Sequence, residues 1–138
     1  LRAQEMNYPT PICASKEASD ENYDAAVAYM MEHLDRMSIF AGTHNELSTY
    51  KLMKLMEKKG VKSNDNRIWF GQLYGMSDNI SYNLAENGFN VAKYLPFGPV
   101  KDVMPYLIRR AEENTSVAGQ TSRELSMIKA ERKRRKEK

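Results

Sequence analysis

The sequence contains one cysteine, Cys13, one tryptophan and two histidines among its 138 residues. A single cysteine cannot form a disulfide within the chain, and no second cysteine or nearby histidine completes a zinc-ligand spacing. These absences exclude a disulfide-stabilised fold and a cysteine-based zinc site, and they are compatible with a reducing compartment. The sequence also lacks an initiator methionine and opens on L-R-A-Q-E-M, a helix-like segment. We therefore expect the chain to be a piece of a longer protein.

Long hydrophobic runs are also missing. No run approaches the roughly 20 apolar residues that a membrane-spanning helix requires, and no signal-peptide pattern opens the chain. We therefore expect a soluble protein.

The formal net charge of +3 is concentrated at the end of the chain. Residues 129–138 hold seven basic and two acidic residues, a charge of +5, which leaves −2 for the rest. Because such a charged run cannot pack into a core, we predict that residues 125–138 form a disordered basic tail. Beside the interpretation as a solubilising tail stand two others, attachment to an anionic membrane and nonspecific contact with nucleic acid.

What the sequence does contain is an alternation of short apolar segments and amphipathic helices. We predict strands over residues 37–42, 67–73 and 90–95. We predict helices over residues 20–36 with Ser19 or Asp20 as N-cap, from Asn45 or Ser48 to Lys58, from Ser77 or Asp78 to Asn87, and over residues 100–114, and the end of a helix at residues 1–6. The strand starts lie about 30 and 23 residues apart, a spacing typical of right-handed βαβ units in a parallel sheet.

Three such units are too few for an independent sheet. A three-stranded parallel sheet leaves both edges unpaired, whereas a closed barrel of about 250 residues has none. We therefore predict an α/β fold in which residues 1–124 supply about three βα units, the C-terminal part of a (β/α)8 TIM-type barrel. We expect the first strand to be buried on both faces and Trp69 to lie in the core.

The last predicted helix has two different faces. Apolar residues recur at helical spacing and predict one buried stripe, formed by Val100, Val103, Met104, Leu107, Ile108 and Ala111. Off this stripe lie Tyr106, Arg110 and Glu113, with Arg109 alongside. Two adjacent arginines can bind a carboxylate through paired N–H donors. The other interpretation is a solvated surface of arginine and glutamate.

Polar residues also follow the predicted strands, where parallel barrels carry their active sites. They are Thr43, His44 and Asn45 after the first strand, Gln72 and Tyr74 at the second, and Lys93 and Tyr94 at the third. Taken alone, His44 is more typical of a helix cap or a core histidine. Lys93 faces either an ion pair inside the barrel or solvent.

Four segments carry a family resemblance: A-G-T-H-N at 41–45, F-G-Q-L-Y-G-M at 70–76, K-Y-x-P-x-G-P at 93–99 and Y-L-I-R-R-A-E-E-N-T-S at 106–116. In this order and spacing they resemble the C-terminal portion of the proline dehydrogenase (proline oxidase) family, up to about residue 124. The resemblance implies an FAD enzyme on a (β/α)8 barrel that oxidises L-proline to Δ1-pyrroline-5-carboxylate and passes the electrons to a membrane quinone. It further implies a cytoplasmic enzyme peripheral to the inner membrane, or a mitochondrial one in a eukaryote.

The resemblance also implies roles for particular residues. Arg109 and Arg110 match the pair that holds the substrate carboxylate, Glu113 matches a carboxylate that orients the pair, and Tyr94 and Tyr106 match aromatics that line the pocket. No residue of the chain is assigned a catalytic role of its own, because the hydride chemistry belongs to the cofactor.

The cofactor-binding residues implied by the resemblance are Thr43, His44 and Asn45, which match a segment that contacts FAD, and Lys16, which matches a loop position near the adenosine end. The family's other flavin-contacting and substrate-binding residues have no counterpart in these 138 residues. We therefore expect the isolated chain to be inactive and to bind no FAD tightly.

Two other functions remain open at this point. One is a non-enzymatic α/β interaction module whose basic tail binds nucleic acid or membrane, and the other is a different barrel enzyme that holds a carboxylate or phosphate with the same arginines. We expect self-association through exposed strand edges and no specific nucleic-acid partner.

Overall fold

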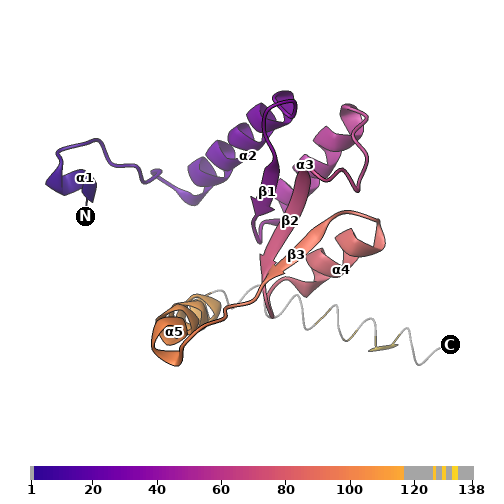
Figure 1. Ribbon diagram of the computed structural model, residues 1–138. Helices are drawn as coiled ribbons and strands as arrows, with labels where there is room; N and C mark the ends of the chain where they lie inside the picture. The colour runs from indigo at the N-terminus through magenta and orange to yellow at the C-terminus, as the bar shows by residue number, and fades with distance from the viewer. Residues whose placement is uncertain (1, 117–125, 127–128, 130–131, 134–138) are drawn as a thin grey trace. The chain divides into compact units, whose positions relative to one another are not determined.

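The computed structural model describes residues 2–116, 126, 129, 132 and 133. The chain divides into two compact units, Leu1–Tyr94 and Leu95–Lys138. The first unit contains α1 (Arg2–Glu5), α2 (Lys16–Glu32), β1 (Ile39–Gly42), α3 (Glu46–Lys58), β2 (Ile68–Leu73), α4 (Asp78–Glu86) and β3 (Val91–Tyr94), and α5 (Val100–Ser116) belongs to the second (Figure 1). The predicted tail over residues 125–138 and the loop before it lie largely outside the described residues.

The three strands form one parallel sheet in the order β1-β2-β3. In β1 and β2, Ile39 pairs with Ile68 and Gly42 with Gly71. In β2 and β3, Phe70 pairs with Val91. Helices α3 and α4 make the two crossovers, so the predicted βαβ rhythm is confirmed.

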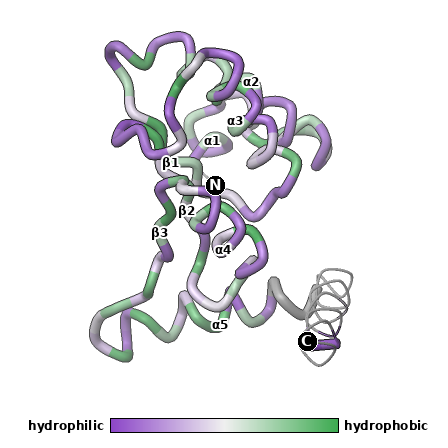
Figure 2. The backbone as a smooth tube through the Cα atoms, turned by 90° about the vertical axis from the view of Figure 1, so that its right-hand side faces the viewer, coloured by the Kyte–Doolittle hydropathy of each residue, from purple (hydrophilic) through white to green (hydrophobic). Residues whose placement is uncertain are grey.

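One face of this sheet is covered by helices, and Figure 2 shows α2, α3 and α4 on one side of the strands. The core between them holds Val27, Met31 and Leu34 of α2 and its end, Ile39 and Ala41 of β1, Leu52 and Met56 of α3, Ile68 and Phe70 of β2, and Ile80 and Leu84 of α4. Because successive strand residues point to opposite faces, alternate residues are left on the uncovered side.

The uncovered face of the sheet corrects two predictions. Phe40 is 64% exposed and Trp69 is 40% exposed, so β1 is buried on one face rather than two and Trp69 does not lie in the core. The indole Nε1 of Trp69 donates a hydrogen bond to the carbonyl of Asn66 at 3.1 Å. The Phe40 ring covers Gly71, where an added Cβ would overlap it. An apolar run predicts a strand but does not say whether both of its faces are covered.

The bounds of α2 differ from the prediction. The helix begins at Lys16 because Ser15 is the N-cap, with its Oγ accepting a hydrogen bond from the amide of Ala18 at 3.1 Å. Ser19, one of the two residues predicted to cap it, instead donates from its hydroxyl to the Ser15 carbonyl at 3.0 Å. The helix ends at Glu32, before the predicted end at Arg36. Both serines satisfy the capping rule in sequence, so local composition did not decide between them.

Most of the apolar stripe predicted to be buried on the last helix is exposed, although Val103 is half-buried. Val100 is 74% exposed, Met104 44%, Leu107 42% and Ile108 50%. Helical periodicity predicts which face of the helix is apolar, but it does not show whether another part of the protein covers that face. Among the described residues, no helix is long and apolar enough to span a membrane.

Candidate functional site

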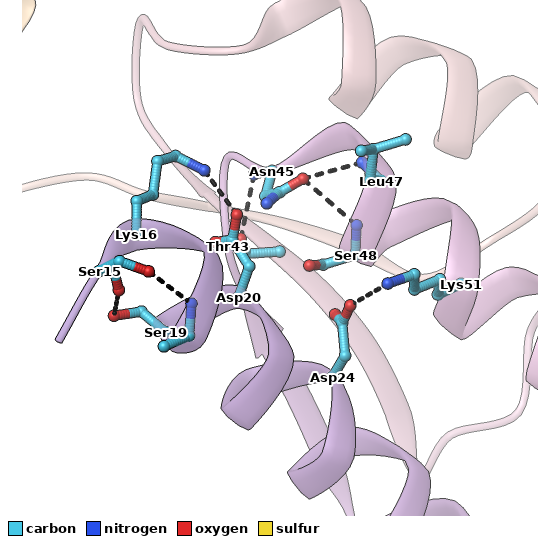
Figure 3. Close-up of polar contacts among 11 residues, drawn as sticks. Ser15, Lys16, Ser19, Asp20, Asp24, Thr43, Asn45, Leu47, Ser48 and Lys51 are labelled. Atoms are coloured by element: carbon cyan, nitrogen blue, oxygen red, sulfur yellow. Dashed lines mark hydrogen bonds and ion pairs between the residues drawn. The ribbon is translucent and has the colours of Figure 1, made fainter. Parts of the chain in front are cut away.

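The loop between β1 and α3 consists of Thr43, His44 and Asn45, at the carboxyl edge of the sheet. Of the two predicted N-caps of α3, Asn45 and Ser48, the structure has Asn45. Its Oδ1 accepts hydrogen bonds from the amides of Leu47 at 2.9 Å and Ser48 at 3.4 Å. The Thr43 hydroxyl accepts from the amide of Asn45 at 3.0 Å. These bonds, drawn in Figure 3, fix the loop backbone against the start of α3.

His44 connects this loop to β2 and to α4. Its Nδ1 lies 2.8 Å from the hydroxyl of Ser77, and the amide of Leu73 donates to Nε2 at 3.5 Å. The side chain is half-buried. His44 therefore caps no helix, but both of its ring nitrogens have partners within the protein, as the second of the two roles expected of it alone requires.

Gln72 of β2 forms a hydrogen bond with the same loop. It is 2% exposed, accepts on Oε1 from the hydroxyl of Ser81 at 2.9 Å, and donates from Nε2 to the carbonyl of Thr43 at 3.4 Å. A carboxamide buried at this depth needs such partners. The position of Gln72 near the end of an apolar strand indicated a polar site, whereas Ser81 gives no comparable signal because serine is common in helices that face solvent.

Lys93 ties β3 to the segment that precedes α4. Its Nζ donates to the carbonyl of Met76 at 2.6 Å and forms an ion pair with Asp78 Oδ1 at 2.8 Å. Of the two predicted alternatives, an ion pair inside the barrel or solvent, the ion pair is present. Lys93 is paired in register with Gln72, however, so it lies on the face of the sheet that the helices cover, not on the uncovered one.

Lys16 and Asp20 lie at the start of α2, near the same loop (Figure 3). Lys16 is 76% exposed at its side chain and forms an i, i+4 ion pair with Asp20. The hydrogen bond from Lys16 is the largest influence and lowers the pKa of Asp20; burial opposes it, and a weaker hydrogen bond from Asn45 lowers the pKa further. The carboxylate therefore connects α2 to the Thr43–Asn45 loop.

One ion pair joins α2 to α3 and lies near the Lys16–Asp20 pair of α2. Asp24 binds Lys51 and receives a hydrogen bond from Ser48. Burial raises the pKa of Asp24, but these two contacts outweigh it and leave the pKa below its usual value. From the sequence, Lys16 was singled out as a cofactor contact and Asp20 only as a possible N-cap, and none of these ion pairs was predicted, because charge pairs on helices are common.

In the second unit, Tyr106 and Arg110 lie one turn apart on α5, with the guanidinium carbon of Arg110 5.4 Å from the centre of the Tyr106 ring. This is a cation–π distance. Arg110 is half-buried and Arg109 is exposed, and Glu113 lies on the same helix. Tyr94, at the end of β3 in the first unit, is 56% exposed. Among the described residues, no group of three histidine, cysteine or acidic side chains is arranged to hold a metal ion.

The comparison with known families identifies the family of the chain. The family model described as proline dehydrogenase matches residues 1–123. The chain belongs to the proline dehydrogenase family. The resemblance carried by its four sequence motifs is thereby confirmed.

Several relatives within this family cover most of the chain. It is 42% identical over 122 residues to the carbapenem antibiotics biosynthesis protein CarD of Pectobacterium carotovorum subsp. carotovorum, covering 88% of this chain and 31% of CarD. It is 39% identical over 137 residues to the mitochondrial proline dehydrogenase 1 of Homo sapiens, covering 97% of this chain and 23% of the human protein. It is 34% identical to the hydroxyproline dehydrogenase of Xenopus laevis, covering 96% of this chain and 29% of the Xenopus protein. The chain thus spans less than a third of the length of these relatives.

A solved structure supports the fold. The chain superimposes with a TM-score of 0.72 and 29% identity on proline utilization A (PutA) from Bdellovibrio bacteriovorus inactivated by N-propargylglycine, covering 83% of this chain and 12% of PutA. The predicted fold class is therefore confirmed: this member of the proline dehydrogenase family supplies βα units of a TIM-type barrel.

Proposed function

We propose that this chain is part of an enzyme that oxidises L-proline to Δ1-pyrroline-5-carboxylate with FAD. The observation that carries the proposal is the family match over residues 1–123, which includes both the Thr43–Asn45 loop and the Arg109–Arg110 pair. Because the relatives are much longer than this chain, the activity belongs to a protein that contains it together with further barrel units.

The residues at the carboxyl edge of the sheet fit a flavin cofactor. The Thr43–Asn45 loop is polar and held on several sides, and the uncovered sheet face beside it carries Tyr94, an aromatic suited to a planar ring. In this proposal Thr43, His44 and Asn45 contact the FAD, and the exposed Lys16 approaches its adenosine end. Bound FAD supplies the hydride acceptor for the ring carbon next to the proline nitrogen.

The residues of α5 would hold the substrate. Arg109 and Arg110 offer two guanidinium groups to one carboxylate, a charge-assisted contact that fixes the orientation of the proline ring. The Tyr106 ring packs against the Arg110 guanidinium and limits the positions that it adopts. In this proposal Glu113 orients the pair, and Tyr94 and Tyr106 line the pocket.

The remaining parts of the proposal concern partners and location. We assign a quinone as electron acceptor and a cytoplasmic location peripheral to the inner membrane. For a eukaryotic protein we assign the mitochondrion, the location that the names of the human and bovine relatives give for those proteins. In the isolated chain, β1 and β3 are edge strands, which favours self-association. We expect that isolated chain to be inactive and to bind no FAD tightly.

Replacing Arg110 by Met in the intact protein tests the proposal. The variant should raise the KM for proline at least tenfold, because a charge-assisted contact to a buried carboxylate is worth about 1.5–3 kcal/mol. Arg36→Met, which removes an exposed arginine paired with Asp35, is the control and should leave KM unchanged. Tetrahydrofuroate, a proline-like ring carboxylate, should compete with proline in the wild type and more weakly in Arg110→Met.

Three results would contradict the proposal. An unchanged KM in Arg110→Met would remove the substrate role of this arginine. Faster turnover of 4-hydroxyproline than of proline would assign the protein to a different substrate. Stoichiometric FAD on the purified isolated chain would overturn the expectation that this part needs the rest of the barrel.

A further inference from the structure

Ser77 has an unusual place in the structure. It precedes α4 at the N-cap position, but its φ of 49° and ψ of 44° lie in the left-handed region, and its side chain makes no capping bond. Ser15 before α2 shows what a serine ordinarily does there: its backbone is extended, at φ −147° and ψ 172°, and its Oγ accepts from the helix. Residues other than glycine and asparagine rarely occupy the left-handed region.

The hydroxyl of Ser77 is directed instead at a residue 33 positions earlier in the chain. Its Oγ lies 2.8 Å from Nδ1 of His44, and the serine is 8% exposed. The Ser77 carbonyl still accepts from the amides of Ile80 and Ser81, both at 3.1 Å. The Ser77 carbonyl therefore accepts hydrogen bonds from the first turn of α4, while the Ser77 hydroxyl forms a hydrogen bond with His44. Strained backbone that persists at a buried position commonly marks a functional constraint.

The second contact of the imidazole fixes its chemical form. The amide of Leu73 points at Nε2 over 3.5 Å, and a backbone amide is a donor that cannot accept. Nε2 must then carry the lone pair, so in the neutral ring the proton is on Nδ1 and is donated to Ser77 Oγ.

We propose that Ser77 is a positioning residue that, together with the Leu73 amide, holds His44 as the neutral Nδ1-protonated tautomer in one ring orientation. The adjacent turn of α4 acts on the same loop, because Ser81 orients Gln72, which binds the Thr43 carbonyl. The start of α4 thus sets the geometry of two residues that we assign to the FAD contact. The consequence for cofactor binding rests on the proposed function, whereas the tautomer does not.

The tautomer can be measured directly on the full chain. Long-range ¹⁵N–¹H correlation spectra at about pH 8.5, two units above the usual imidazole pKa, separate the two neutral tautomers. His44→Ala identifies the His44 signals. We expect the wild type to show one tautomer with Nδ1 protonated. A wild type with Nε2 protonated, or with mixed tautomers, would overturn the proposal.

Ser77→Gly is the decisive variant. Glycine accepts a φ of 49° without strain, so the substitution removes the hydroxyl without opposing the fold. The expected result is loss of the single-tautomer pattern. Asn7→Gly is the matched control, because Asn7 is the other non-glycine residue with positive φ in the described part of the chain, at 53°. It should leave the His44 signals unchanged, and an unchanged tautomer in Ser77→Gly would refute the role of Ser77.

A second measurement, on the intact protein, separates this inference from the proposed function. Ser77→Gly should weaken FAD binding roughly fivefold, the effect of losing one hydrogen bond. If His44→Ala leaves FAD binding unchanged, the cofactor role of His44 fails while the tautomer result stands. If Ser77→Gly keeps both the tautomer and the FAD affinity while His44→Ala loses FAD, the inference fails and the proposed function stands.

Discussion

The carboxamide of Gln72 on β2 joins the hydroxyl of Ser81 on α4, with Ser81 Oγ donating to Gln72 Oε1 at 2.9 Å. The same carboxamide donates to the carbonyl of Thr43, so a strand, a helix and a loop are linked through one buried side chain. The loop in question is the one that we assign to the cofactor. Its geometry therefore depends on residues that do not themselves belong to it.

Gln72→Leu is expected to lower the free energy of unfolding by about 1–3 kcal/mol, because it leaves buried polar groups without a partner. Urea denaturation of the full chain measures the change. The matched control is Gln4→Leu at an exposed position of α1, which should shift stability by no more than about 0.5 kcal/mol. Equal effects of the two substitutions would show that the Gln72 network contributes nothing.

Ser15→Ala and Ser19→Ala distinguish the observed start of α2 from the predicted one. Ser15→Ala should destabilise by about 1 kcal/mol, the usual effect of losing an N-cap side chain. Ser19→Ala should have a smaller effect, because its hydroxyl donates within the first turn and caps no amide. The readouts are the urea midpoint and the amide exchange of Ala18. The reverse order of effects would place the cap at Ser19.

The pair of Asp65 and Arg67 predicts a dependence of stability on pH. The Arg67 side chain, and then its backbone amide, hold the pKa of Asp65 at about 2, below the usual value of 3.8. Because the folded-state pKa is the lower one, the unfolded chain takes up the proton first as pH falls. The stabilisation is therefore complete above about pH 4 and is lost as pH falls toward about 2.

Urea midpoints at about pH 5 and about pH 3 test this dependence on pH. Asp65→Asn should show a smaller difference between the two than the wild type. Asp35→Asn removes an exposed carboxylate that pairs with the neighbouring Arg36, and it serves as control. If Asp65→Asn and the wild type lost stability in parallel over this interval, the assigned pKa of Asp65 would be wrong.

Phe40 and Phe70 lie on opposite faces of the sheet and test whether one face is open. Phe70 is fully buried, so Phe70→Ala should cost about 3–5 kcal/mol. Phe40 is 64% exposed, so Phe40→Ala should cost about 1 kcal/mol or less.

The same pair addresses self-association. We predict association through the exposed strand edges; if the uncovered sheet face contributes as well, Phe40→Ala on the edge strand β1 should weaken the association, measured by sedimentation velocity over a range of concentrations. A loss of stability in Phe40→Ala as large as in Phe70→Ala would mean that this face is covered.

The family and the order of elements were predictable from the sequence. The strand-helix rhythm, the two candidate caps Asn45 and Ser48, of which the structure has Asn45, and the family motifs are properties of short segments that can be recognised without knowledge of contacts. The exact caps were less accessible. Ser15 and Ser19 are equally good caps in composition, and Ser77 occupies a capping position without capping.

The sequence by itself determined that this chain is a parallel α/β member of the proline dehydrogenase family, because periodicity and motifs are encoded locally. The tertiary structure decided that one face of the sheet stays uncovered, that Lys93 pairs with Asp78, and that Ser77 binds His44 rather than α4. The Ser77 and Lys93 contacts join residues 33 and 15–17 positions apart. Such contacts depend on how strands and helices pack, and no local pattern records them.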